Sequence, residues 1–244
     1  MADDRSKVSF TINGRPASGE RGASLLEAIR RHGFRVPSLC HHEAVAPYGA
    51  CRLCLVEVKQ GKRSRLTTSC NYPVREGIEV LLDTEAVVRH RRVVLELMLA
   101  SAPAAAPVRV LAAEYGVRST PFAIVDAKND CIDCGLCARV CKEVVGQDAL
   151  GFGGRGVKRK MTTPYDEENP ACIGCGACAY VCPTGCVKIV DEANERVLER
   201  WKRRMPMRPC ITCGRPIAPD AQLVRFAGQI QAAPGRFDKC GECR

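Results

Sequence analysis

The sequence predicts an α+β protein made of several small modules, each organised around a group of cysteines. Seventeen cysteines occur in 244 residues, whereas aromatic residues make up only 5%, so side-chain packing alone does not supply the core. A chain of this length allows two or three small domains. The cysteines fall into four separated groups, and the pattern C-x2-C-x2-C-x3-C occurs twice.

The N-terminus and the apolar segments indicate a soluble, cytoplasmic chain. MADDRSKVSF is charged and lacks the apolar stretch of a signal peptide, and VVLELMLA is too short and too charged to cross a bilayer. In a reducing compartment, closely spaced cysteines bind metals more often than they form disulfides. We therefore expect metal sites.

The first module is expected over residues 1–82. KVSFTING alternates apolar and polar residues and ends in an Asn-Gly turn, so a returning strand should follow. A helix is expected at Ser24, with Ser24 and Glu27 as a capping box and Gly33 as its left-handed stop. The cysteines then follow as C-x10-C-x2-C-x15-C, at Cys40, Cys51, Cys54 and Cys70.

This order of strands, helix and cysteines resembles a β-grasp [2Fe-2S] ferredoxin domain. Plant-type ferredoxins have a shorter first gap. The long gap, within SLCHHEAVAPYGACRLCLVEV, is similar to the N-terminal domain of the iron-sulfur subunit of NAD-reducing hydrogenases. It is also similar to that domain in the large peripheral-arm subunit of complex I, in [FeFe] hydrogenases and in NAD-linked formate dehydrogenases. The resemblance implies a [2Fe-2S] cluster on the four cysteines; a zinc site is the disfavoured alternative.

Residues 83–122 are expected to form a helical connector, with a helix from Thr84 to Ser101 capped near Asp83. In the relatives just named, this helix leads into a [4Fe-4S] module held by one histidine and three cysteines. Here the segment ASAPAAAPVRVLAAEYGV contains neither residue type, and His90 has no cysteine near it. We predict that this cluster is absent, so the relay order of the family does not carry over unchanged.

Residues 123–192 carry the strongest signal. CIDCGLCARVCK and CIGCGACAYVCP each supply three cysteines to one cube, and the fourth, one helical turn on, points at the other. The repeat resembles a bacterial two-[4Fe-4S] ferredoxin, with GFGGRGVKRK as a β-hairpin between its halves. The crossover predicts one set of Cys131, Cys134, Cys137 and Cys182, and a second set of Cys172, Cys175, Cys178 and Cys141.

The glycines of that hairpin match a dinucleotide-binding motif by letter only. Gly151, Gly153 and Gly156 read G-x-G-x-x-G, but VKRKMTTP follows where a helix should begin, and no long apolar strand precedes. We treat the match as chance and expect no flavin or NAD on this chain.

The C-terminal part is predicted as a linker helix over residues 193–208 and a four-cysteine tail over residues 209–244. DEANERVLERWKRR reads as amphipathic, with Val197, Leu198 and Trp201 on one side, as either a docking or a solvated helix. The tail reads C-x2-C-x26-C-x2-C and resembles a pair of zinc knuckles. A further iron-sulfur centre and redox-active thiols are the alternatives to Zn²⁺. Its candidate ligands are Cys210, Cys213, Cys240 and Cys243.

These assignments leave one cysteine and revise the charge. Cys186 is expected to pack as a small apolar residue beside the cluster that Cys182 binds, with ligand exchange or a redox role as the alternative.

The formal charge of +10 treats thiols as neutral. One [2Fe-2S], two [4Fe-4S] and one zinc site would each carry about −2, which leaves about +2. No aromatic-basic stripe favours nucleic acid as the partner.

The function expected is electron transfer. The sequence offers no nucleophile, acid-base pair or pocket motif, whereas twelve cysteines fit three electron-carrying centres. The resemblance implies a subunit of a cytoplasmic NAD(P)-linked oxidoreductase, without a catalytic site of its own, between a flavin-containing NAD(P)H-oxidising subunit and a catalytic subunit. A [NiFe] hydrogenase is the first choice of catalytic partner; a formate dehydrogenase or another flavin-coupled, including bifurcating, complex is the alternative. An iron-sulfur redox regulator that binds nucleic acid is the alternative from another class.

Overall fold

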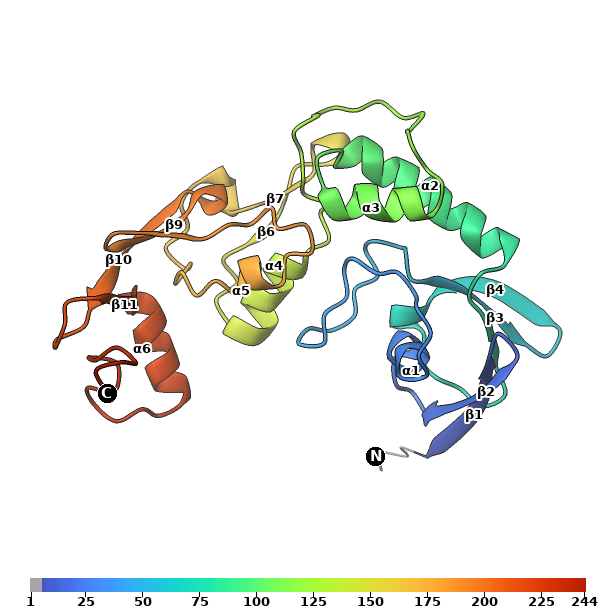
Figure 1. The fold of residues 1–244 in the computed structure, drawn as a ribbon, viewed down its shortest axis with the longest axis horizontal. Helices are drawn as coiled ribbons and strands as arrows, with labels where there is room; N and C mark the ends of the chain where they lie inside the picture. Colours follow the sequence, from blue (N-terminus) through green and yellow to red (C-terminus); the bar gives the residue numbers. More distant parts are fainter. Residues whose placement is uncertain (1–5) are drawn as a thin grey trace. The chain divides into compact units, whose positions relative to one another are not determined.

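The computed structural model describes residues 6–244, and the chain divides into two compact units between Cys134 and Gly135 (Figure 1). The division falls inside the expected 123–192 module rather than at its start. Hydrogen bonds tie residues before Cys134 to the first unit: the amide of Ala104 donates to the carbonyl of Asn129 (3.0 Å), and the Asn129 side chain donates to the carbonyl of Ser101 (2.6 Å).

The first unit is built on a mixed, five-stranded sheet. Its strands are β1 (Lys7–Ile12), β2 (Arg15–Glu20), β3 (Leu55–Gln60), β4 (Arg63–Thr68) and β5 (Glu79–Leu81). They lie in the order β2-β1-β5-β3-β4, with β1 and β5 parallel and the other pairs antiparallel. The β1–β2 hairpin turns at Asn13 and Gly14, both at positive φ, as the Asn-Gly pair predicts.

Helix α1 (Leu25–Arg31) covers this sheet and completes a β-grasp fold. Its apolar face, Leu25, Leu26 and Ile29, is fully buried in a core shared with β1, β3 and β5. The helix stops at Gly33, which has the expected left-handed φ of 78°. The alternating strands and the helix spacing therefore predicted this part of the fold correctly.

The capping box expected at the start of α1 is wrong. Ser24 occupies the N-cap position without capping, and its hydroxyl donates to the carbonyl of Cys70 (3.4 Å). Glu27 lies 3.6 Å from His41 instead of reaching back. The reason is tertiary: the amide of Leu25 already donates to the carbonyl of Tyr72 (2.9 Å), so a neighbouring segment satisfies the helix end.

Two helices form the connector, α2 (Glu85–Ser101) and α3 (Ala106–Glu114), and they lie side by side (Figure 1). The cap of α2 is Thr84, whose hydroxyl accepts from the amide of Val87 (3.4 Å). This confirms the cap expected near Asp83, whose own carboxylate accepts a hydrogen bond from Arg91 in α2 (3.1 Å).

The second unit begins with the cysteine repeat. Its helices are α4 (Leu136–Arg139), which continues as a π-helical segment (Val140–Val145), α5 (Ala177–Tyr180) and α6 (Asp220–Gln229). Gly135 and Gly176, at φ 73° and 84°, precede α4 and α5, so both halves of the repeat enter their helix through a left-handed glycine. Between them, β6 (Gly151–Gly153) pairs antiparallel with β7 (Lys160–Thr162), which confirms the hairpin; the glycines of the letter match lie in it.

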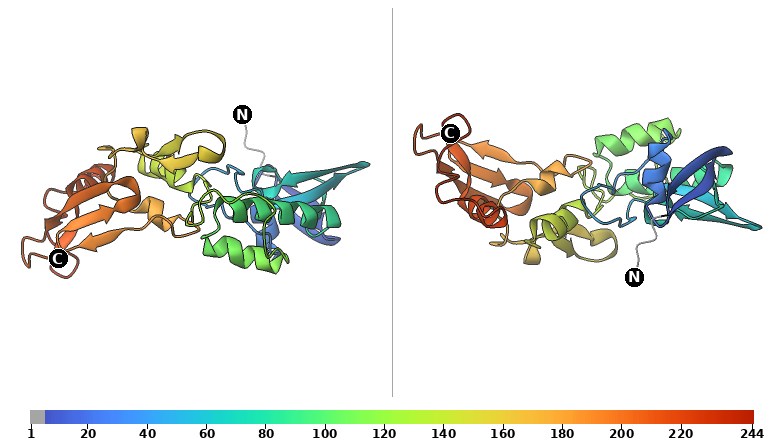
Figure 2. Two further views of the ribbon diagram at one scale, coloured as in Figure 1. Left: turned by 90° about the horizontal axis from the view of Figure 1, so that it is seen from above. Right: turned by 90° about the horizontal axis from the view of Figure 1, so that it is seen from below.

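The linker helix predicted over residues 193–208 is wrong, because this segment forms strands. A four-stranded sheet runs in the order β11-β10-β9-β8. Its strands are β8 (Val190–Glu192), β9 (Glu195–Leu198), β10 (Arg203–Pro209) and β11 (Pro216–Pro219). The chain reverses between β8 and β9 at Ala193, which has a φ of 50°, and between β9 and β10 through a 3₁₀ turn, Glu199–Trp201. Helix α6 packs against β10 and β11 (Figure 2).

Among residues 6–244, no helix combines the length and the apolar character needed to cross a membrane.

Candidate metal centres

The first cysteine group lies in the loop before β3 and in the turn after β4. All four sulfur-bearing residues are buried; they are Cys40, Cys51, Cys54 and Cys70. Backbone amides point at these sulfurs: the amide of Cys51 donates to Sγ of Cys40 (3.3 Å) and the amide of Leu39 to Sγ of Cys51 (3.4 Å). Such donors stabilise negative charge on sulfur and influence the reduction potential of a cluster.

The four sulfurs of this group form two pairs. A hydrogen bond between the thiols of Cys51 and Cys40 raises the pKa of Cys51, and burial adds to the shift. A hydrogen bond from Cys70 lowers the pKa of Cys54 to about 6, while the pKa of Cys70 is raised by the same contact. A [2Fe-2S] cluster needs two thiolates on each of two irons. The two contacting pairs of cysteines therefore fit such a cluster.

A buried arginine that was not anticipated supports this loop. Arg91 of α2 is 1% exposed, and its guanidinium donates to the carbonyls of Leu53 (3.2 Å) and Leu55 (2.7 Å), the two neighbours of Cys54. It also pairs with Asp83 (3.1 Å) and donates to the hydroxyl of Tyr115 (3.0 Å). The sequence gives only a weak signal for this role, one basic residue among several in EAVVRHRRVVLELMLAS.

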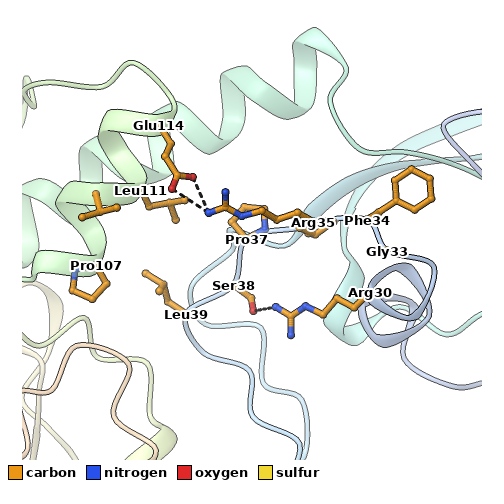
Figure 3. A pocket seen from close by; sticks show the side chains of 12 residues that line it. Arg30, Gly33, Phe34, Arg35, Pro37, Ser38, Leu39, Pro107, Leu111 and Glu114 are labelled. Atoms are coloured by element: carbon orange, nitrogen blue, oxygen red, sulfur yellow. Dashed lines mark hydrogen bonds and ion pairs between the residues drawn. The ribbon is translucent and has the colours of Figure 1, made fainter.

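The segment that leads into Cys40 is fixed to the connector. Arg35 donates to both carboxylate oxygens of Glu114 in α3 (3.0 and 2.9 Å), and Arg30 donates to the hydroxyl of Ser38 (2.6 Å). Figure 3 shows both pairs among the side chains that line a cavity, together with Leu39 and Leu111. Helix α3 of the connector and helix α1 thus both hold the segment that leads into Cys40.

The first predicted [4Fe-4S] set is divided between the two units. Cys131 and Cys134 end the first unit, and Cys137 and Cys182 belong to the second. This set therefore stays a prediction. The amide of Cys131 donates to the side chain of Asn129 (3.1 Å), the same residue that is bonded to Ser101.

Cys186 contacts the predicted ligand Cys182. Their sulfurs are 3.5 Å apart, and this hydrogen bond is the largest cause that raises the pKa of Cys182 to about 12. Cys186 is half-buried. The Cys186 sulfur thus contacts the sulfur of a predicted cluster ligand, whereas the sequence led us to expect only apolar packing beside the cluster.

The second predicted [4Fe-4S] set lies around one cavity. Its walls carry four cysteines from both halves of the repeat, Cys141, Cys172, Cys175 and Cys178. The apolar lining of this cavity includes Leu150, Ile173 and Leu198. The fourth cysteine of the first half thus meets the first three of the second half, in the arrangement that the crossover predicts.

Burial raises the pKa values of three of the thiols around this cavity. It raises the pKa of Cys178 to about 12 and is the largest cause of the raised pKa values of Cys141 and Cys172. The amide of Ala149 donates to Sγ of Cys141 (3.4 Å). Thiolates in such a place need cationic partners, and four thiolates around iron satisfy that need. Trp201 also lines this cavity. The sequence had indicated only that Trp201 lies on the apolar side of a helix.

The C-terminal group is much tighter. The four sulfurs all lie within 4.8 Å of one another, on Cys210, Cys213, Cys240 and Cys243. Those of Cys213 and Cys240 are 3.7 Å apart. Tetrahedral zinc with Zn–S bonds of about 2.3 Å places its sulfurs about 3.8 Å apart. Cubane ligands bind four different irons and spread wider, so this group fits a single ion.

Hydrogen bonds lower the pKa values of two of these thiols, Cys210 and Cys213. The amide of Cys240 donates to Sγ of Cys210 (3.3 Å) and is the largest cause that lowers the pKa of Cys210 to about 6. The side chain of Arg215 lowers the pKa of Cys213. Metals bind the thiolate form, so these residues favour metal binding near neutral pH.

Comparison with known proteins agrees with these centres. Residues 5–85 match the model of a "2Fe-2S iron-sulfur cluster binding domain", and residues 130–186 match that of a "4Fe-4S dicluster domain". The two models leave the connector and residues 187–244 outside their ranges.

Two curated relatives are similar to a part of this chain. The chain is 32% identical over 172 residues to "NADPH-Fe(3+) oxidoreductase subunit alpha" of Geobacter sulfurreducens, covering 61% of this chain and 20% of that protein. It is 31% identical over 188 residues to the mitochondrial "NADH-ubiquinone oxidoreductase 78 kDa subunit" of Candida albicans, covering 67% and 26%. The chain thus spans only a fifth to a quarter of the length of these relatives.

A solved structure of an NAD⁺-reducing [NiFe]-hydrogenase is also similar, with a TM-score of 0.57 and 28% identity. The match covers 64% of this chain and 74% of that one. The chain therefore joins a [2Fe-2S] cluster-binding domain to a [4Fe-4S] dicluster domain, and part of it is related to subunits of an NADPH-Fe(3+) oxidoreductase and of NADH-ubiquinone oxidoreductase and to a chain of an NAD⁺-reducing [NiFe]-hydrogenase.

Proposed function

We propose that this chain is the electron-transfer subunit of a multi-subunit, cytoplasmic NAD(P)-linked oxidoreductase. The observation that carries the proposal is the cavity at which Cys141 from one half of the repeat meets Cys172, Cys175 and Cys178 from the other. When bound, iron-sulfur clusters supply one-electron carriers, which suits a partner that splits the electron pair of NAD(P)H at a flavin.

The residues of the chain hold and adjust three such centres. Cys40, Cys51, Cys54 and Cys70 bind the [2Fe-2S] cluster, and backbone amides of the loop donate to their sulfurs. The two sets of the dicluster domain are those of the predicted crossover. One is Cys131, Cys134, Cys137 and Cys182; the other is Cys172, Cys175, Cys178 and Cys141.

The C-terminal cysteines hold one Zn²⁺ with a structural role. Support comes from the short distances between their sulfurs and from the thiol pKa values lowered by Cys240 and Arg215. All four coordination positions of the ion are filled by thiolates, as in structural rather than catalytic zinc sites.

The partners are a flavin-containing NAD(P)H-oxidising subunit and a catalytic subunit. A [NiFe] hydrogenase is the first choice for the latter, and the similarity to the NAD⁺-reducing hydrogenase structure supports it. A formate dehydrogenase, or another flavin-coupled complex such as the NADPH-Fe(3+) oxidoreductase named among the relatives, is the alternative.

The native complex tests this proposal. The chain should co-purify with a flavin-containing subunit, and NADH or NADPH should reduce its clusters only when that subunit is present. Reduction by H₂ would identify a hydrogenase partner, whereas reduction by formate would identify a formate dehydrogenase. A monomer with no flavin-containing partner would contradict the proposal, and salt-dependent DNA binding by that monomer would favour the redox regulator instead.

A further inference from the structure

Trp201 is placed where a side chain can act on the second [4Fe-4S] site. It ends the 3₁₀ turn between β9 and β10, is 1% exposed, and lines the cavity together with the four cysteines. The dicluster model ends at residue 186. The sheet that carries Trp201 is therefore an addition to that domain, and it brings the only tryptophan of the chain into the cavity.

The indole nitrogen of Trp201 is buried and has no hydrogen-bond partner within residues 6–244. An indole N–H can only donate, and a buried donor without an acceptor is rare in proteins because it loses its bond to water. The cavity that Trp201 lines is also lined by four cysteines, whose sulfurs are possible acceptors. The missing partner is thus an acceptor on the cavity side, at or beside a sulfur.

The turn holds the indole in this position. The amide of Lys202 donates to the carbonyl of Glu199 (2.9 Å), and Leu198 pairs with Arg203 across β9 and β10. The guanidinium of Arg200 lies over the indole ring, 5.6 Å from its centroid. The donor is therefore presented by fixed backbone, which is what a hydrogen bond of defined strength requires.

We propose that the indole N–H of Trp201 donates a hydrogen bond to a cysteine sulfur of the second [4Fe-4S] cluster and raises the reduction potential of that cluster. A donor that withdraws charge from a ligand sulfur stabilises the more negative, reduced state. The inference rests on the proposed function, because it takes Cys141, Cys172, Cys175 and Cys178 as the ligands. It assigns the C-terminal sheet a second task besides carrying the four-cysteine group.

The test uses the full chain with its clusters and the fact that it contains one tryptophan. The Trp201→Phe variant keeps an aromatic ring and loses the donor, so the second cluster should show a lower midpoint potential, with iron content and the other centres unchanged. That cluster is identified by the EPR signal that Cys178→Ser removes. Leu198→Met is the matched control, since it alters the same cavity wall without changing any donor and should leave the potential unchanged.

A second measurement does not depend on a variant. Tryptophan labelled with ¹⁵N marks residue 201 alone, and pulsed EPR of the reduced protein should show coupling of the second cluster to that nitrogen and to an exchangeable proton. An unchanged potential in Trp201→Phe, or no ¹⁵N coupling in a chain with its full iron content, would overturn the inference alone. A chain that lacks the second cluster would overturn the proposed function and this inference together.

Discussion

The two four-cysteine sites of the second unit are built in opposite ways. Cys141, Cys172, Cys175 and Cys178 line one cavity, and burial raises the pKa of three of these thiols. In the C-terminal site the four sulfurs lie within 4.8 Å of one another, and hydrogen bonds lower the pKa values of Cys210 and Cys213 but raise the pKa of Cys243 to about 12.

The comparison teaches that C-x2-C spacing alone does not determine how closely the sulfurs of a site approach one another. Both sites contain it, and the rest of the fold makes the difference. In the dicluster domain, two left-handed glycines start short helices that hold the cysteines apart around a space. In the C-terminal site, two turns bring pairs of sulfurs together. The backbone around the motif, rather than the motif itself, thus sets the spacing of the sulfurs.

The largest expected effect is on the metal content of variants that lack one cysteine of either site. Cys178→Ser should remove about four irons from the protein and leave its zinc, because a cubane with one weak ligand is lost as a whole. Cys210→Ser should remove the zinc and leave the irons. Elemental analysis of both purified variants measures this; a loss of about four irons in Cys210→Ser would mean that the comparison is wrong.

Removal of the zinc should have the next largest effect. A chelator should release it and loosen residues 210–244, since folding of so small a region depends on metal binding. Limited proteolysis should then cut near α6 at least about tenfold faster, while the visible absorption of the clusters stays unchanged. Equal cleavage rates with and without the chelator would show that the ion, if bound, has no structural role.

Two glycine variants sharpen the comparison at the cluster loop. Gly174→Ala would strain a φ of 69° and place its Cβ 2.8 Å from Sδ of Met205, a cost of about 2–4 kcal/mol in the free energy of unfolding. Gly185→Ala strains a φ of 67° with no atom within 4 Å, and should cost about 1–2 kcal/mol. Denaturant unfolding measures both; equal costs would mean that packing of Met205 on this loop contributes nothing.

The smallest effect concerns thiol reactivity in the metal-free protein. Arg215 lowers the pKa of Cys213, an exposed residue, so Cys213 should be alkylated at pH 7 well before Cys178, whose pKa is raised to about 12 by burial. Arg215→Gln should raise the pKa of Cys213 and slow its alkylation a few-fold at pH 7.

The same variant provides its own control at high pH. At pH 10 the thiolate form of Cys213 predominates with or without Arg215, so the two alkylation rates should converge. Peptide mass spectrometry follows each cysteine separately. A rate difference that persists at pH 10 would mean that Arg215 acts through access to the thiol rather than through its pKa.

The sequence predicted the parts of this molecule in which local pattern and tertiary structure agree. The alternation of KVSFTING, the Asn-Gly turn and the spacing of Leu25, Leu26 and Ile29 gave the hairpin and α1. Glycine placement gave the β6–β7 hairpin. The cysteine repeat gave the set that now surrounds one cavity.

Tertiary structure overrode the pattern elsewhere. DEANERVLERWKRR contains good helix formers, yet it turns at Ala193 and becomes β8, β9 and β10, because pairing in the C-terminal sheet outweighs weak propensities. Its apolar residues were identified correctly, but not the place where Trp201 is buried. Arg91 was missed for the same reason: its partners are carbonyls distant in the sequence.

Iron, sulfide and zinc analysis of the intact protein, with EPR of the reduced form, tests the central claim most directly. One [2Fe-2S] cluster, two [4Fe-4S] clusters and one Zn²⁺ predict about ten irons and one zinc per chain. About fourteen irons without zinc would mean that the C-terminal cysteines hold a further cubane, and about six would mean that one cavity of the dicluster domain carries no cluster. Either result would contradict the assignment of centres on which the proposed electron transfer rests.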